Sequence, residues 1–145
     1  GGQKICHCLE MSKPTLGLSK WAPEKSDFIN TISEKSLGYG KSNTYKILNY
    51  YKNSSLTEEN CAAYRCSIYS TEKAAAGEWF LPSRDELDLM YKAMKEAAVS
   101  DATINWFWSS SENTSDYAWY QRFKQGYQDY GGRGLINSVR AIRAF

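Results

Sequence analysis

Apolar residues recur at helical spacing between residues 87 and 98, and this is the clearest pattern in the chain. The apolar positions are Leu87, Met90, Tyr91, Met94 and Ala98. Ser83 and Glu86 have the spacing of a capping box, in which the serine hydroxyl and the glutamate carboxylate each accept an amide proton of the first turn. The pattern predicts a helix over residues 84–97 with its apolar face in the core.

Two shorter helices are predicted before this one. Asn43 suits the N-cap of a helix over residues 44–51, whose apolar residues fall on one face. Ser55 and Glu58 fit a second capping box, which predicts a helix over residues 57–66. Residues 11–27 and 37–41 contain glycine or proline and are expected to be mostly loop.

The pattern changes to strands in the last third of the chain. Residues 106–108, 117–123 and 139–145 are rich in aromatic and β-branched side chains, and residues 4–9 read as a further short strand. Residues 126–138 contain four glycines, which predicts an irregular exposed loop. Helices followed by strands indicate an α+β fold with a small, mostly antiparallel sheet.

Length and composition point to one ordinary globular domain. The 145 residues carry a net charge of +2, so the whole chain gives no global signal for nucleic-acid binding. No apolar run approaches the roughly 20 residues of a membrane-spanning helix. We therefore expect one domain over residues 1–145, without a membrane span.

The cysteines and the lone histidine give little support to catalysis or metal binding. The cysteines are Cys6, Cys8, Cys61 and Cys66. A continuous helix would hold Cys61 and Cys66 too far apart for a disulfide, but a bridge between the two regions stays open. His7 and its neighbouring cysteines match no common zinc-site spacing and no catalytic pair. We expect structural cysteines, no metal, no cofactor and no enzyme activity.

The last quarter of the chain has the composition of a binding surface. Residues 119–145 carry five basic side chains and one acidic side chain, and tyrosines stand among glycine, arginine, aspartate and asparagine. Tyrosine provides a large contact area at low entropic cost, and small polar residues adapt to a partner. A plain solvated loop is the alternative, and single-stranded nucleic-acid binding is a third interpretation.

Several segments of the sequence together resemble a known family. They are GEWFLPSRDELDLMY (77–91), WFWSSSE (106–112), AWYQRF (118–123) and VRAIRAF (139–145). These motifs are similar to those of bacterial domains with the C-type lectin fold. The resemblance covers nearly the whole chain and implies a single C-type-lectin-like domain with a long irregular region near its end.

One branch of that family consists of variable proteins diversified by retroelements, and the resemblance implies a variable region at about residues 119–138. The display residues implied are Tyr120, Arg122, Lys124, Tyr127, Asp129, Tyr130, Gly131, Gly132, Arg133, Gly134, Leu135 and Ile136. A lysine codon cannot arise from the family's randomised asparagine codons, so Lys124 is the weakest member. We expect these side chains to be mostly exposed and to gather on one face.

The resemblance favours a receptor-type binding protein on a cell surface, outside the cell, or on a phage or virus particle. A fixed surface adhesin or pilus-tip module is the alternative, and an enzyme related to the formylglycine-generating enzymes is a distant third. The calcium-binding motifs of sugar-binding relatives and the late cysteines of that enzyme group are both missing from the sequence. The expected partner is a protein or other macromolecular surface rather than nucleic acid, bound by a monomer.

Overall fold

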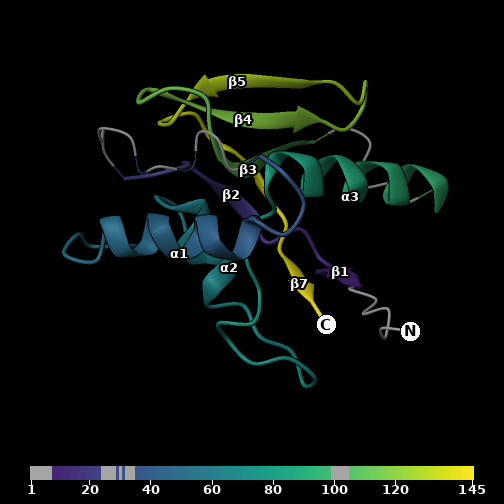
Figure 1. The fold of residues 1–145 in the computed structure, drawn as a ribbon, viewed down its shortest axis with the longest axis horizontal. Coiled ribbons are helices and arrows are strands. Elements are labelled where there is room, and N and C mark those ends of the chain that lie inside the picture. The colour runs from purple at the N-terminus through teal and green to yellow at the C-terminus, as the bar shows by residue number, and fades with distance from the viewer. Residues whose placement is uncertain (1–7, 24–28, 30, 32–34, 99–104) are drawn as a thin grey trace, which may run out of the picture.

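The computed structural model describes residues 8–23, 29, 31, 35–98 and 105–145, and it has an α+β fold (Figure 1). In chain order the elements are β1 (Leu9–Met11), β2 (Gly17–Ser19), α1 (Gly40–Tyr50), α2 (Ala62–Ser67), α3 (Arg84–Glu96), β3 (Trp106–Glu112), β4 (Tyr117–Arg122), β5 (Gln128–Gly132), β6 (Asn137–Val139) and β7 (Ile142–Ala144). Within the described residues these form three helices and two small, mostly antiparallel sheets, as the sequence predicts in outline.

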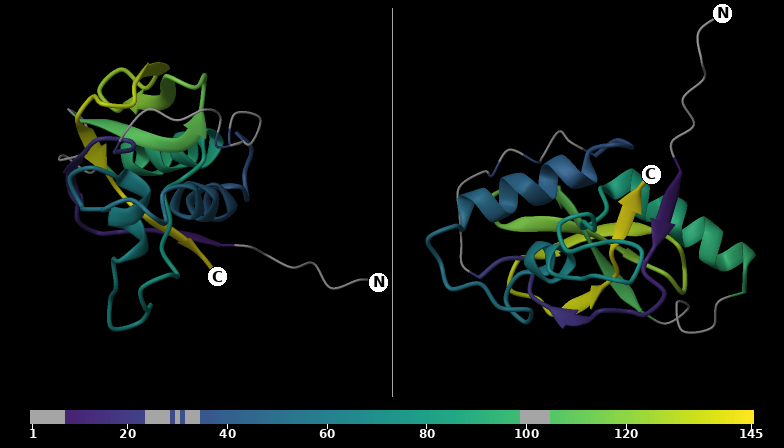
Figure 2. Two further views of the ribbon diagram at one scale, coloured as in Figure 1. Left: turned by 90° about the vertical axis from the view of Figure 1, so that its left-hand side faces the viewer. Right: turned by 90° about the horizontal axis from the view of Figure 1, so that it is seen from below.

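The larger sheet has the strand order β2-β6-β3-β4-β5. Its pairings are antiparallel except between β6 and β3, which run parallel. The smaller sheet pairs β1 with β7, which lie side by side in Figure 2. The last two strands of the chain therefore belong to different sheets, and β6 lies between β2 and β3 in the larger sheet.

Helices cover both faces of the larger sheet, and each face has its own core. Successive residues of β3 point to opposite faces, as the period of a strand requires. Trp108 is fully buried in the core that includes Ile47 of α1 and Ala62 of α2. Phe107 is fully buried on the other face, against Leu87 and other side chains of α3.

The capping box of α3 forms as predicted and also fixes the start of α1. The Ser83 hydroxyl accepts from the Glu86 amide at 3.3 Å, and the Glu86 carboxylate accepts from the Ser83 amide at 2.8 Å. The buried carboxylate also accepts from the amides of Gly38 and Gly40, at 3.1 and 3.0 Å. A Cβ on Gly40 would lie 2.2 Å from a Glu86 oxygen, so this contact requires glycine.

Several boundaries predicted in the first half of the chain are wrong. α1 begins at Gly40, so Asn43 lies inside the helix and is buried rather than acting as its cap. The helix expected over 57–66 is limited to Ala62–Ser67, because Thr57 and Asn60 bond to each other's backbone amides and form a separate turn. The segment 11–27 is mostly loop in its described residues, as expected, although it also contains β2 and the last residue of β1. Of the strand expected at 4–9, residues 4–7 lie outside the described residues, and β1 begins at Leu9.

The long irregular loop expected at residues 126–138 is also wrong, because this stretch contains β5 and the start of β6. Gly131 and Gly132 pair with Ala118 and Tyr117 of β4, so they are strand residues rather than turn residues. The single strand expected over 139–145 is instead the end of β6 and the whole of β7, which belong to different sheets.

Two substitutions compare how much the N-cap of α3 and the buried core contribute to the free energy of unfolding. Ser83→Ala should lower the free energy of unfolding by about 1 kcal/mol, because it removes the N-cap acceptor of α3. Trp108→Ala should lower it by about 3–5 kcal/mol, because the ring is fully buried. Chemical denaturation of both variants measures the difference, and equal losses would contradict the assignment of Trp108 to the core.

The buried thiols should resist alkylation. Cys8, Cys61 and Cys66 are free thiols, whereas Cys6 lies outside the described residues. Burial raises the pKa of Cys61 to about 11, and burial together with the nearby Cys61 raises the pKa of Cys66. Both thiols are therefore protonated and unreactive at pH 8.

We expect iodoacetamide at pH 8 to modify the exposed Cys8 in the native protein and to spare Cys61 and Cys66, as peptide mass spectrometry would measure. All three cysteines should react after unfolding in guanidinium. Native-state labelling of Cys61 as fast as that of Cys8 would contradict the burial.

Candidate functional site

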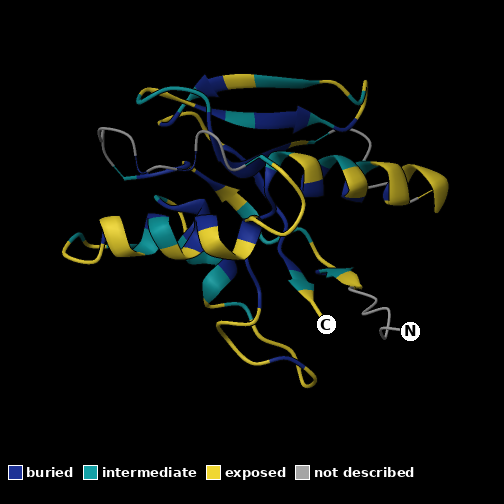
Figure 3. Cartoon of the chain, in the orientation of Figure 1, coloured by how far each residue is buried: buried dark blue, intermediate teal, exposed yellow. Residues whose placement is uncertain are grey.

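Strand β4 presents two different sets of side chains because its residues alternate between the faces of the sheet. Ala118, Tyr120 and Arg122 lie on the face covered by α1 and α2, whereas Trp119 and Gln121 lie on the face of α3. Figure 3 shows that β4 is mostly buried and that β5, at the edge of the sheet, has an exposed stretch.

Aromatic rings and one arginine form an ordered stack where the first of these faces reaches solvent. Trp106 of β3 lies parallel to Tyr120, with 5.4 Å between ring centroids and an interplanar angle of 3°. The Arg122 guanidinium lies 3.9 Å from the Trp106 ring centroid and 5.0 Å from that of Tyr127. Its Nη2 donates to the Tyr120 hydroxyl at 3.4 Å. Stacking against rings restrains the guanidinium before any ligand arrives.

An apolar hollow of about 330 Å³ adjoins the stack. Its lining residues are Leu18, Asn105, Trp106, Leu135, Ile136, Asn137 and Ser138. Leu18 and Ile136 are 57% and 62% exposed, which is unusual for large aliphatic side chains. We call the stack and the apolar part of the hollow together the Trp106 surface, which consists of Leu18, Trp106, Tyr120, Arg122, Tyr127, Leu135 and Ile136.

The opposite face of β4 and β5 carries a second aromatic cluster. Tyr130 meets Trp119 edge-on at 5.4 Å and lies 5.8 Å from Tyr117. The Arg84 guanidinium lies 3.8 Å above the Trp119 ring. Arg84 also donates to the side chain of Gln128 at 2.7 Å, and these contacts fix β5 to the start of α3.

Arg133 turns inward and holds the turn between β5 and β6. It forms a buried ion pair with Glu112, and its guanidinium lies 4.5 Å from the Trp21 ring centroid. The Glu112 carboxylate also accepts from the amides of Ile29 and Thr31, at 3.0 and 2.8 Å. These contacts satisfy a buried carboxylate, so the role of Arg133 here is to support the fold.

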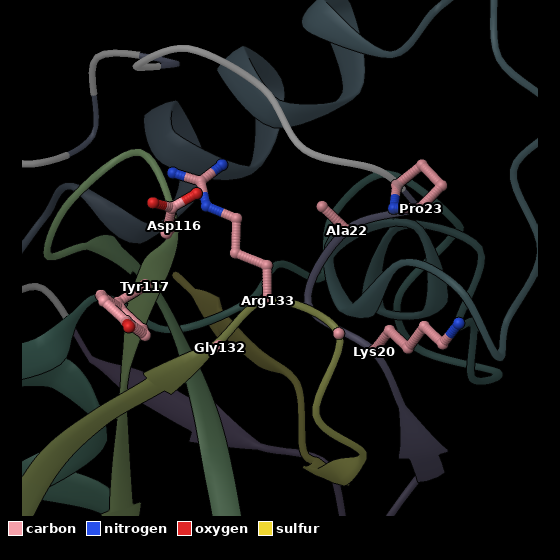
Figure 4. Close-up of a pocket in the computed structure, with 8 residues that line it drawn as sticks. Lys20, Ala22, Pro23, Asp116, Tyr117, Gly132 and Arg133 are labelled. Carbon is pink, nitrogen blue, oxygen red and sulfur yellow. The ribbon is translucent and has the colours of Figure 1, made fainter.

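A second hollow, of about 440 Å³, is lined in part by Arg133 and Gly134 of the same turn (Figure 4). Lys20, Pro23, Asp116 and Tyr117 line it together with Arg133, whose charge is already paired with Glu112. Its lining is more polar than that of the first hollow, and it contains no exposed large aliphatic side chain.

The structure divides the twelve predicted display residues among different environments. Six are exposed: Lys124, Tyr127, Tyr130, Gly134, Leu135 and Ile136. Three are half-buried: Arg122, Asp129 and Gly132. Three are buried: Tyr120, Gly131 and Arg133. The set does not gather on one face, because Tyr130 lies on the α3 side and Arg133 points into the core.

Sequence reasoning missed Leu18 and assigned Trp106 to the scaffold alone. The sequence did contain a signal that Trp106 belongs beside the other rings. In the segment Trp106-Phe107-Trp108 a strand places its first and third residues on the same face of the sheet. Near the end of the strand the first ring is 40% exposed. Leu18 had no local signal, because it reaches the hollow through the pairing of β2 with β6.

The described residues contain no group of three or more histidine, cysteine, aspartate or glutamate side chains placed to hold a metal ion. Within the same part of the chain, every helix is too short or too polar to cross a membrane. The Trp106 surface consists of aromatic, aliphatic and cationic side chains.

A crystal structure of a fimbrial protein from Bacteroides ovatus has a similar fold, with a TM-score of 0.64 and 16% sequence identity. The match covers 94% of this chain but only 35% of that chain, so this chain spans about a third of the length of the fimbrial protein. Neither a protein-family model nor a curated protein matches the sequence.

Arg133 should be essential for stability, unlike an exposed member of the same predicted set. Arg133→Ala should lower the free energy of unfolding by about 3–5 kcal/mol, because it leaves Glu112 buried without its cation. Tyr130→Ala should lower it by no more than about 1 kcal/mol, because the ring is half exposed. Urea denaturation measures both, and similar losses would contradict the separation into scaffold and surface.

Proposed function

We propose that this chain is a binding domain of a fimbrial or other cell-surface adhesin, with a C-type-lectin-like fold and no enzyme activity. It binds a protein or other macromolecular surface through the Trp106 surface, acting outside the cell as a monomer and without a metal or cofactor. The exposed combination of aromatic, aliphatic and arginine side chains carries this proposal. The similarity of the fold to that of a fimbrial protein supports the proposed location on the cell surface.

The composition of the Trp106 surface supports binding because tryptophan, tyrosine and arginine are the residue types that most often dominate binding energy. Its rings and its guanidinium are held by contacts within the sheet, so little side-chain entropy remains to be lost when a partner binds. Large aliphatic side chains exposed together also characterise interaction sites on soluble domains.

Diversification of this surface by a retroelement is the second candidate. Tyr127, Leu135 and Ile136 favour it, since all three are exposed on the Trp106 surface and can change without disturbing the core. Tyr120, Gly131 and Arg133 weigh against randomisation of the whole set, because each is buried. An asparagine-rich near-repeat of the gene's 3′ end beside a reverse transcriptase gene would identify a diversified protein.

Adhesion measurements test the proposed function. Beads coated with the domain should adhere to a panel of cultured animal cells and bacterial cells, and Trp106→Ala and Ile136→Asp should lower the number of bound beads at least tenfold. Tyr45→Ala is the matched control, because Tyr45 is an aromatic residue of α1 that is 71% exposed. Thermal melts establish that the variants are folded.

Two results would overturn this function. One is the failure of wild-type beads to adhere to any cell of the panel. The other is adhesion that stays unchanged in Trp106→Ala and Ile136→Asp, which would place the binding site elsewhere on the domain.

A further inference from the structure

Arg122 differs in its contacts from three other arginines that the structure describes. Arg65, Arg133 and Arg143 each form an ion pair with a glutamate. Arg122 forms no ion pair with any carboxylate among the described residues, and the only hydrogen bond of its side chain there is to the Tyr120 hydroxyl. Within this part of the chain, its positive charge therefore has no opposite charge paired with it.

The surroundings hold this guanidinium in place. The pKa of Arg122 is raised, first by the hydrogen bond to the Tyr120 hydroxyl and then by nearby groups that include Asp129. Asp129 does not pair with the guanidinium, and one of its carboxylate oxygens instead accepts from the Tyr130 amide at 2.8 Å. A planar guanidinium held against rings favours a ligand group that accepts two hydrogen bonds at once, such as a carboxylate.

The apolar hollow begins next to this cation. The Arg122 guanidinium lies against the Trp106 ring, and Trp106 also lines the hollow. The cation and the hollow are two subsites that share this side chain. Leu18, Leu135 and Ile136 supply the aliphatic lining. A ligand that satisfies both subsites carries a carboxylate and, close to it, a large aliphatic group.

We propose that the Trp106 surface binds an extended peptide segment of its partner in which a large aliphatic residue and a glutamate or aspartate are two positions apart. This proposal rests on the proposed function and names the chemistry of the partner. Residues two apart on an extended chain point to the same side, roughly 7 Å from each other. The aliphatic side chain then enters the hollow while the carboxylate meets Arg122.

Other ligand classes fit this surface less well. Nucleic acid is bound through several cations that follow the phosphate backbone, whereas Arg122 is the one cation of the Trp106 surface. An acidic sugar shares the carboxylate but has no aliphatic group for the hollow formed by Leu18, Leu135 and Ile136. The aliphatic subsite therefore favours a peptide.

Three short peptides separate the contributions of the two subsites. Ac-Gly-Leu-Thr-Glu-Gly-NH2 contains both groups, Ac-Gly-Leu-Thr-Gln-Gly-NH2 lacks the charge, and Ac-Gly-Ser-Thr-Glu-Gly-NH2 lacks the aliphatic side chain. Titration of the labelled domain, followed by two-dimensional ¹H–¹⁵N NMR, measures weak binding and identifies the residues affected. Glucuronic acid serves as the acidic-sugar probe.

The first peptide should bind the wild-type domain about five- to twentyfold more tightly than either of the others, since it alone satisfies both subsites. Its signal changes should centre on the Trp106 indole and Ile136. Arg122→Gln should remove the preference for Glu over Gln, whereas Arg122→Lys should keep part of it. Lys52→Gln is the control, because it makes the same change of net charge at an exposed position after α1.

Equal affinity of the wild-type domain for the Glu and Gln peptides would overturn the proposal. So would a preference that survives in Arg122→Gln, or glucuronic acid binding at Arg122 where the peptides do not bind. Each of these results leaves the adhesin function standing if Trp106→Ala still abolishes bead adhesion. Loss of the function itself would appear in the adhesion experiment.

Discussion

The buried ion pair between Glu112 and Arg133 is the constraint on which the arrangement of the candidate site depends. A carboxylate removed from water must be paired and hydrogen-bonded, and Glu112 meets this requirement through Arg133, Ile29 and Thr31. The pair joins the end of β3 to the turn after β5. Leu135 and Ile136 follow Arg133 after a single residue, Gly134, so the ion pair anchors the chain close to the lining of the apolar hollow.

The alternation of side chains along β4 determines which residues can act together. Tyr120 and Arg122 share a face with Trp106, and the neighbouring residues Trp119 and Gln121 contact α3 or its surroundings instead. A binding site on this sheet therefore uses every second residue of a strand, and it takes its remaining members from other strands. This geometry separates Tyr127 from Tyr130, although they are close in sequence and similar in chemistry.

The sequence predicted those parts of the fold that depend on local pattern. Helix α3 and its capping box could be predicted from the spacing of Ser83, Glu86 and the apolar residues that follow. The aromatic strands β3 and β4 were also recognisable. β5 was missed, because Gly131 and Gly132 have no strand preference and extend only by pairing with β4. The inward direction of Arg133 was missed because its partner is 21 residues away.

On the Trp106 surface, the residues that determine stability differ from those that determine what a partner would contact. Tyr120 lies beneath the exposed rings, and a Cβ on Gly131 would come within 2.8 Å of Leu135 and 3.1 Å of the Tyr120 ring. These two positions and Arg133 determine whether the surface forms. Tyr127, Leu135 and Ile136 are exposed at its rim, where a substitution changes what a partner meets and costs little stability. Related domains could therefore acquire new partners by changing rim residues, provided that the ion pair and the close contact at Gly131 are kept.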